Sequence, residues 1–254
     1  MGSIRSLVEE AARKYGDKTF VFYEDEQVSF KEMNNVANKV AHAFLLEGIG
    51  KGDRVAIMLL NRPEYLYVWF GLNKIGASMV PINSAFTAYE TEYIINHSES
   101  KMVVTDTNHY KVIEKASGNC PQLGKVILLD GDKKPEKGEL FWDFIEDKPI
   151  DLKEIEIKSD DEAAILYTSG TTGRPKGCIE DQLYYLQIGK MYVRDHQIDS
   201  TDRILTPLPL FHMNAQTLST MGALMTGAGL ILMDRFHPST WWETVRSLKA
   251  TIFH

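Results

Sequence analysis

The chain has 254 residues, enough for one large domain or two smaller ones, and its 44% hydrophobic and 25% charged residues are typical of a soluble globular protein. Its net charge of −7 comes with no basic stripe, so nucleic acid is not an expected partner. No apolar run approaches the ~20 residues of a membrane helix, and the N-terminus lacks the apolar core of a secretory signal. Two cysteines, Cys120 and Cys178, argue against a disulfide scaffold or a structural zinc site, and we expect a reducing, cytoplasmic location.

Strands and helices alternate in the first half of the chain. Residues 19–30 predict a β-hairpin, after which Ser29 caps a helix whose apolar stripe ends at Gly48. The segment DRVAIMLL at 53–60 contains a continuous apolar run, the pattern of a strand buried on both faces. The alternation continues with a helix from Pro63, a strand at 78–82, a helix from Tyr89, and strands at 101–106 and 125–130.

An acidic segment interrupts this alternation. Between Asp130 and Glu162 there are thirteen acidic and six basic residues, a balance of −7 that equals the net charge of the whole chain. Its prolines and glycines predict a solvated, loop-rich connection. One short helix is expected within it, anchored by Phe141, Trp142, Phe144 and Ile145.

The alternation then resumes to the end of the chain. Strands are expected at 163–169, 203–208 and 229–234, and helices from Asp181, from Asn214 and around Trp241, where Trp241 and Trp242 are expected to pack. Such alternation predicts an α/β fold with largely parallel sheets and helices on both faces.

Residues 165–177, ILYTSGTTGRPKG, place hydroxyls, glycines and a lysine directly after a buried strand. The carboxyl end of such a strand is where α/β sheets bind ligands. Glycines allow the backbone to approach a ligand closely, and hydroxyls, backbone N–H groups and Lys176 together suit a phosphate group. The segment is neither a Walker A loop nor a G-x-G-x-x-G motif. We therefore predict an anion-binding loop rather than an ordinary surface loop.

This segment closely resembles the phosphate-binding signature of the adenylate-forming superfamily, which includes acyl-CoA synthetases, luciferases and adenylation domains of peptide synthetases. Residues 28–65, 72–106 and 207–215 are similar to further conserved regions of that superfamily. The resemblance implies that residues 1–254 form the N-terminal portion of its large adenylation domain. It also implies a two-step reaction, in which ATP converts a carboxylic acid to an acyl-adenylate and coenzyme A then displaces AMP.

The resemblance also implies roles for individual residues. It assigns the triphosphate of ATP to Thr168, Ser169, Gly170, Thr171, Thr172, Gly173 and Lys176, with Lys176 also catalytic. It implies Mg²⁺ with ligands mostly beyond residue 254, so no metal site is expected within this chain. Coenzyme A is implied as co-substrate, and a small carboxylic acid as substrate.

A second implied site follows the phosphate loop. By resemblance to acyl-CoA synthetases, His212 is expected beside the acyl pocket as a catalytic gate residue, with Met213 and Asn214 also binding substrate. The alternative is a histidine that is simply hydrogen-bonded at a strand-to-helix junction. No acidic residue stands at 211–214 to pair with a substrate ammonium, so an α-amino acid is not expected. Met221, Leu224 and Met225 could shape an acyl site, but plain core packing is favoured.

Two departures from the superfamily pattern stand out. After Gly177 the usual Ser/Thr-His pair is replaced by CIEDQLYY, although Asp181 can still cap the next helix. The later superfamily motifs are absent, so we expect a fragment or a natural truncation that makes no adenylate alone and whose exposed sheet edges allow a homo-oligomer. Two alternatives to an acid–CoA ligase stay open: a non-catalytic nucleotide- or phosphate-binding remnant, and an adenylate-forming relative with a different acceptor.

Overall fold

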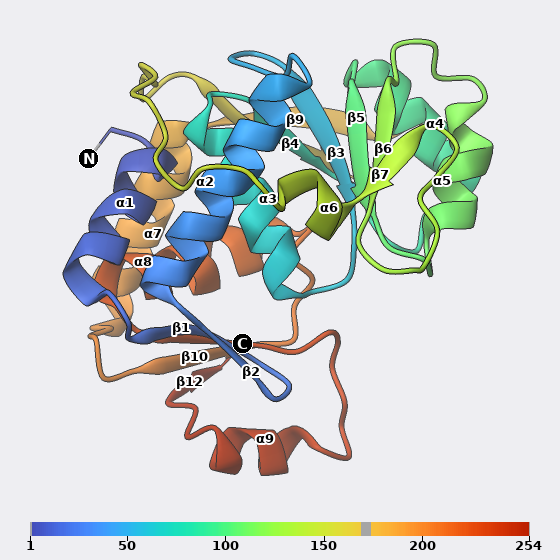
Figure 1. Cartoon of the computed structure of the whole chain (residues 1–254). Coiled ribbons are helices and arrows are strands. Elements are labelled where there is room, and N and C mark those ends of the chain that lie inside the picture. The colour runs from blue at the N-terminus through green and yellow to red at the C-terminus, as the bar shows by residue number, and fades with distance from the viewer. Residues whose placement is uncertain (1, 169–173, 254) are drawn as a thin grey trace.

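Two β-sheets enclose a layer of helices, and further helices cover the outer face of each sheet (Figure 1). This computed structural model describes residues 2–168 and 174–253. The predicted α/β class with largely parallel sheets and helices on both faces is confirmed. No helix in the described ranges is both long and apolar enough to cross a membrane.

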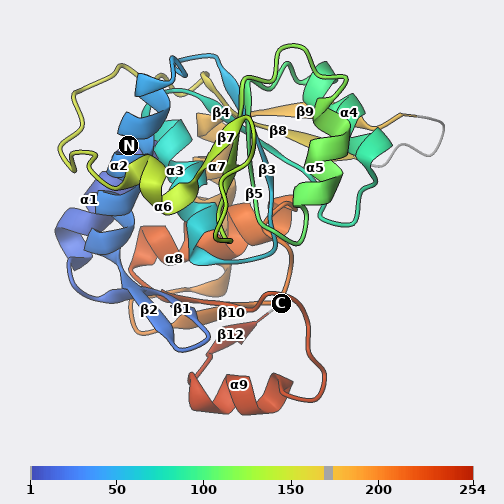
Figure 2. The same ribbon diagram turned by 45° about the vertical axis from the view of Figure 1, so that its right-hand side comes forward.

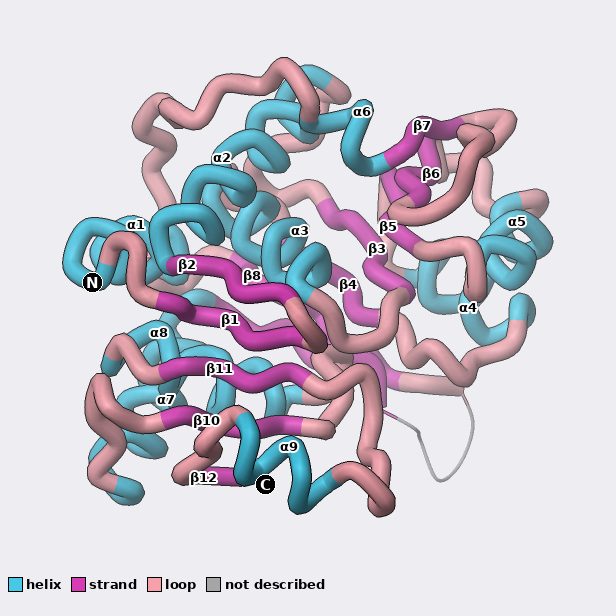
Figure 3. Tube along the Cα trace, turned by 60° about the horizontal axis from the view of Figure 1, so that its bottom comes forward, coloured by secondary structure: helices cyan, strands magenta, loops and turns pink. Residues whose placement is uncertain are grey.

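The first sheet joins the two ends of the described chain. Figure 3 shows its five strands side by side, in the spatial order β12 (Ile252–Phe253), β10 (Arg203–Thr206), β11 (Gly229–Leu232), β1 (Thr19–Tyr23) and β2 (Glu26–Ser29). Neighbouring strands are parallel except for the β1–β2 hairpin, which matches the hairpin predicted at 19–30.

The second sheet carries the predicted anion-binding segment, residues 165–177, at one edge. Its seven described strands have the order β7 (Gly138–Leu140), β6 (Lys125–Leu128), β5 (Met102–Thr105), β3 (Arg54–Met58), β4 (Ser78–Pro81), β8 (Glu162–Thr168) and β9 (Lys176–Asp181). All pair in parallel except β9, which runs antiparallel to β8.

The layer between the sheets forms the main hydrophobic core. It consists of α1 (Ile4–Tyr15), α2 (Phe30–Leu46), α3 (Pro63–Lys74), α7 (Gln182–His196), the π-helix η1 (Ala215–Thr220) and α8 (Met221–Thr226). Strand β3 shows how the sequence divides between layers, because successive side chains point to opposite faces. Val55 and Ile57 enter this core, whereas Ala56 and Met58 enter a second core on the other face.

The outer helices complete the layers. On the far side of the seven-stranded sheet lie α4 (Ala88–His97) and α5 (Tyr110–Ser117), whose buried Ile94, Ile95 and Ile113 pack against Ala56 and Met58. On the far side of the five-stranded sheet lies α9 (Trp241–Ser247). Trp241 of this helix is buried as expected, but the expected packing of Trp242 is wrong, since that side chain is 58% exposed.

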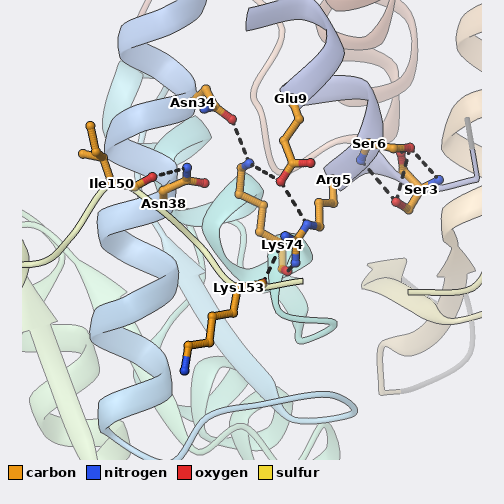
Figure 4. A network of polar contacts seen from close by, with 9 residues as sticks. All are labelled: Ser3, Arg5, Ser6, Glu9, Asn34, Asn38, Lys74, Ile150 and Lys153. Carbon is orange, nitrogen blue, oxygen red and sulfur yellow. Dashed lines mark hydrogen bonds and ion pairs between the residues drawn. The ribbon is translucent and has the colours of Figure 1, made fainter. Parts of the chain in front are cut away.

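The acidic segment is loop-rich as predicted, with one short helix, α6 (Phe141–Ile145), after β7. Phe141, Phe144 and Ile145 are buried, but Trp142 is 51% exposed and does not anchor the helix. A five-residue helix buries one side, and Trp142 falls on the other. Main-chain oxygens in the rest of the segment accept hydrogen bonds from helices of the central layer. Asn38 Nδ2 donates to Ile150 O at 2.6 Å, and Arg5 Nη2 donates to Lys153 O at 3.1 Å (Figure 4).

Candidate functional site

The β8–β9 hairpin carries the predicted phosphate-binding segment (Figure 2). Strand β8 is buried along its middle and becomes exposed at Thr168, its carboxyl end. Ser169, Gly170, Thr171, Thr172 and Gly173 lie outside the described residues. The sequence did not predict β9: no strand was expected between the loop in 165–177 and the helix from Asp181, whereas the structure has a strand that begins at Lys176.

Thr168 and Lys176 are register partners across the hairpin, so the structure brings these two predicted residues together. Both side chains are exposed. Within the described ranges, Lys176 takes part in no ion pair, whereas five other lysines do. An exposed, unpaired ammonium at the carboxyl end of a sheet strand can attract an anion without first giving up a partner.

The amino end of β8 is fixed by side chains from β3 and α3. Arg54 of β3 forms a bidentate ion pair with Glu162, with Nε to Oε1 at 2.9 Å and Nη2 to Oε2 at 3.1 Å. The hydrogen bond to Glu162 raises the pKa of Arg54, so the guanidinium stays charged. Asn73 of α3 donates to the main-chain oxygen of Ala163 at 3.1 Å. The hairpin therefore grows out of a firmly held strand.

The second predicted group lies between β10 and η1. His212 is exposed, its backbone N–H donates to Pro209 O at 2.9 Å, and its ring lies 4.6 Å from that of Phe211. Among the described residues, neither ring nitrogen has a hydrogen-bond partner, so the alternative of a hydrogen-bonded junction histidine gains no support. No described hydrogen bond or ion pair joins His212 to Lys176.

Asn61 organises this segment, and the sequence analysis missed it. The side chain is 1% exposed and follows β3. Its Nδ2 donates to the main-chain oxygens of Leu208 and Met233, both at 2.8 Å, and its Oδ1 accepts from the N–H of Leu210 at 2.6 Å. Asn61 thus joins the carboxyl ends of β3, β10 and β11. The only sequence feature that could have identified Asn61 is its place as a polar residue directly after a buried strand.

Tyr184 is a second residue that the sequence analysis missed. Its hydroxyl donates to Sδ of the half-buried Met213 at 2.8 Å. Tyr184 lies in the first turn of α7, which Asp181 caps as predicted by accepting from Tyr184 N at 2.7 Å. Strand β9 ends at Asp181 and α7 begins at Gln182. The hairpin therefore leads directly into the helical turn whose Tyr184 contacts Met213.

The residues after Met213 form a π-helix, a geometry often found at functional sites. Asn214 is exposed and directly precedes it. Met221 and Leu224 of α8 are buried, and a Cβ built at Gly189 of α7 would lie 2.8 Å from Met221 Cβ. This close helix packing favours the core interpretation of Met221 and Leu224 over an acyl-pocket role.

Comparison with curated proteins gives matches over nearly the whole chain. The crotonobetaine/carnitine–CoA ligase of Citrobacter koseri is 33% identical over 259 residues, which cover 98% of this chain and 50% of that ligase. The ligase of the same name from Proteus sp. is also 33% identical, over 261 residues with the same coverage. The chain thus spans about half the length of the curated relatives it matches.

Comparison with solved structures gives the same result. An anthranilate–CoA ligase in complex with anthranoyl-AMP superposes with a TM-score of 0.94 at 26% identity, covering 99% of this chain and 49% of that one. The N-terminal domain of FACL13 from Mycobacterium tuberculosis gives a TM-score of 0.91 at 27% identity, covering 100% and 62%. A family model described as "AMP-binding enzyme" matches residues 8–254. The chain belongs to the AMP-binding enzyme family.

Proposed function

We propose that the protein carrying this chain is an ATP-dependent acid–CoA ligase. In the first step a carboxylate attacks the α-phosphate of ATP, releasing pyrophosphate and leaving an acyl-adenylate. In the second step the thiol of coenzyme A attacks the acyl carbon, AMP leaves, and an acyl-CoA thioester is formed. The relatives named as CoA ligases support this pair of reactions.

One observation carries the proposal most directly: Lys176 stands exposed and without an ion-pair partner in the described chain, opposite Thr168 at the carboxyl end of β8. Adenylate formation concentrates negative charge on the phosphates, and a fixed cation stabilises that charge as it develops. We assign triphosphate binding to Thr168, Lys176 and, from the sequence alone, to Ser169, Gly170, Thr171, Thr172 and Gly173.

The proposed acid substrate lacks an α-amino group. His212, Met213 and Asn214 are assigned to its binding, with His212 at the entrance used by coenzyme A. No carboxylate stands at 211–214 to neutralise a buried ammonium beside the reacting carboxylate. The relatives named above act on crotonobetaine, carnitine and anthranilate, so the acid itself has to be found by testing.

The proposal extends to Mg²⁺, to domain organisation and to location. The described residues contain no group of three or more His, Cys, Asp or Glu side chains suited to a metal ion. Mg²⁺ is proposed from the sequence resemblance alone, and we assign it no step. We place the chain in the N-terminal portion of a large adenylation domain, which its superposition on the FACL13 N-terminal domain supports.

Two free cysteines suit a cytoplasmic location. Homo-oligomerisation stays a prediction from the sequence.

Acid-dependent pyrophosphate exchange tests the proposal. The protein from the complete reading frame is assayed with ATP, Mg²⁺ and a panel containing crotonobetaine, anthranilate, medium-chain fatty acids and α-amino acids, followed by thioester analysis with coenzyme A. We expect exchange with at least one acid that is not an α-amino acid, and the matching acyl-CoA. ATP binding without exchange would instead support a non-catalytic remnant, and adenylate without thioester would support another acceptor.

A further inference from the structure

Helix α4 lies beside the β8–β9 hairpin (Figure 2) and contacts both β8 and the residues that directly precede β9, next to the proposed phosphate-binding residues. Four side chains make these contacts in a row: Arg174, Tyr93, His97 and Tyr167. We call this row the α4 clasp. Tyr93 and His97 are one turn apart on α4, and their ring centres lie 5.3 Å apart.

On the β9 side, the clasp holds the residues that lead into Lys176. The hydroxyl of Tyr93 donates to the main-chain oxygen of Pro175 at 3.2 Å. The guanidinium carbon of Arg174 lies 5.2 Å from the centre of the Tyr93 ring, within the range of a cation–π contact. Two consecutive residues before Lys176 are therefore tied to one tyrosine.

On the β8 side, the clasp holds the residue before Thr168. The hydroxyl of Tyr167 lies 2.8 Å from His97 Nδ1. Burial raises the pKa of Tyr167 to about 12, so this phenol keeps its proton at neutral pH. The ring lies across Gly177, its register partner, where an added Cβ would come within 3.2 Å of Tyr167 Cζ and 2.9 Å of Ile165 Cγ2. Glycine at this position gives the tyrosine room to reach α4.

Helix α4 is itself a fixed support. Thr87 and Glu90 form a capping box at its start, and Ile94 and Ile95 are completely buried against the sheet. The hydrogen bonds of Tyr93 and Tyr167 thus tie the hairpin to a helix that is also packed against other strands of the same sheet.

We propose that the α4 clasp positions Thr168 and Lys176 for the triphosphate of ATP. This inference rests on the proposed function, and it makes Tyr93, His97 and Tyr167 positioning residues rather than catalytic ones. Contacts that hold the two hairpin ends before the nucleotide arrives reduce the ordering cost of binding. Their loss therefore weakens interaction with ATP and leaves the acid site unchanged.

Tyr93→Phe and Tyr167→Phe test the clasp, because each removes one hydroxyl and keeps the ring. Tyr89→Phe is the matched control, since Tyr89 lies on the same helix and is 69% exposed. In the protein from the complete reading frame, we expect each clasp variant to raise the KM for ATP about threefold to tenfold, the range for one hydrogen bond. The KM for the acid and the melting temperature should stay at the wild-type values, and Tyr89→Phe should change nothing.

An unchanged KM for ATP in both clasp variants would overturn the inference while leaving the proposed function intact. So would an equal rise in the KM for ATP and for the acid together with a lower melting temperature, which would indicate general loosening. Titration calorimetry with ATP supplies the same comparison without turnover, so the clasp is tested even if no acid supports exchange. Absence of ATP binding by the wild-type protein would overturn both proposals.

Discussion

Lys74, whose side chain is completely buried at the end of α3, donates from Nζ to Oδ1 of Asn34 on α2, 2.8 Å away (Figure 4). Glu9 of α1 accepts from the same ammonium at 3.3 Å and from Arg5 Nε at 2.9 Å. Burial lowers the pKa of Lys74 to about 8, and Glu9 opposes that shift only in part. Three helices of the central layer therefore meet at one buried ammonium group, whose removal from water opposes folding.

This burial predicts a rise in stability with pH. Between pH 8 and the ordinary lysine pKa of 10.5, the unfolded chain keeps the Lys74 proton that the folded chain has lost. The contribution of Lys74 to the free energy of unfolding should therefore increase across that window. Lys18 and several tyrosines also titrate in this range, so the difference between proteins is the readout: urea unfolding at several pH values should show a more positive slope in the wild type and in the exposed-lysine control Lys190→Met than in Lys74→Met. An equal slope in all three proteins would contradict the prediction.

Lys176→Ala should reduce pyrophosphate exchange by about 10²-fold or more, because it removes a charge that stabilises the transition state. Lys190→Ala, an exposed lysine on α7, serves as the control and should leave the rate unchanged. Exchange at the wild-type rate in Lys176→Ala would refute the assignment.

His212→Ala should impair the choice of acid and thioester formation more than the use of ATP. The reason is its place beside Met213 in the proposed acid site, with no described hydrogen bond or ion pair from its side chain to Lys176. Both half-reactions should be measured separately. A defect confined to the KM for ATP is the result that would count against this role.

Asn61→Ala should destabilise the fold by about 1–3 kcal/mol, because it leaves buried backbone groups at Leu208, Leu210 and Met233 without their partner. Denaturant unfolding measures the loss, and Asn108→Ala, at an exposed position, is the control. A variant as stable as the wild type would mean that water replaces all three bonds.

The two thiols should differ sharply in reactivity. Cys178 is exposed, whereas Cys120 is buried and burial raises its pKa to about 11. A disulfide reagent at pH 8 should label Cys178 fast and Cys120 only slowly, because the thiolate is the reacting form. Cys178→Ser should remove the fast phase. A fast phase that survives in that variant would show that Cys120 is accessible.

Local patterns predicted most of the fold. The apolar run at 53–60, the caps at Ser29 and Asp181, and the alternation of elements each depend on neighbours in sequence, and the structure contains all of them. Strand β9 was missed because it is an edge strand without an apolar face, and its Ile179 is 63% exposed. The sequence also placed Trp142 and Trp242 wrongly, since a short helix does not reveal which side it buries.

The candidate site was predictable only in part, for a related reason. Hydroxyls and glycines after a strand indicate an anion loop locally, so Lys176 could be named from the pattern, whereas Thr168 was named from the family resemblance. Asn61 and Tyr93 could not, because their partners lie 147 to 172 and 82 residues away in sequence. Only the folded arrangement shows that Asn61 bonds the segment before His212 and that the outer helix α4 contacts the hairpin.

The position of β1 has a consequence for synthesis. This strand lies between β2 and β11, with Val21 paired to Leu230, while β3 to β6 pair with one another within residues 54–128. At about 5–20 residues per second, roughly 10–40 s pass between translation of Val21 and of Leu230. A lone two-stranded hairpin is marginally stable in water. The first strand made is thus among the last to acquire its parallel neighbour, and Phe20 and Val21 stay open to chaperones while the other sheet already forms.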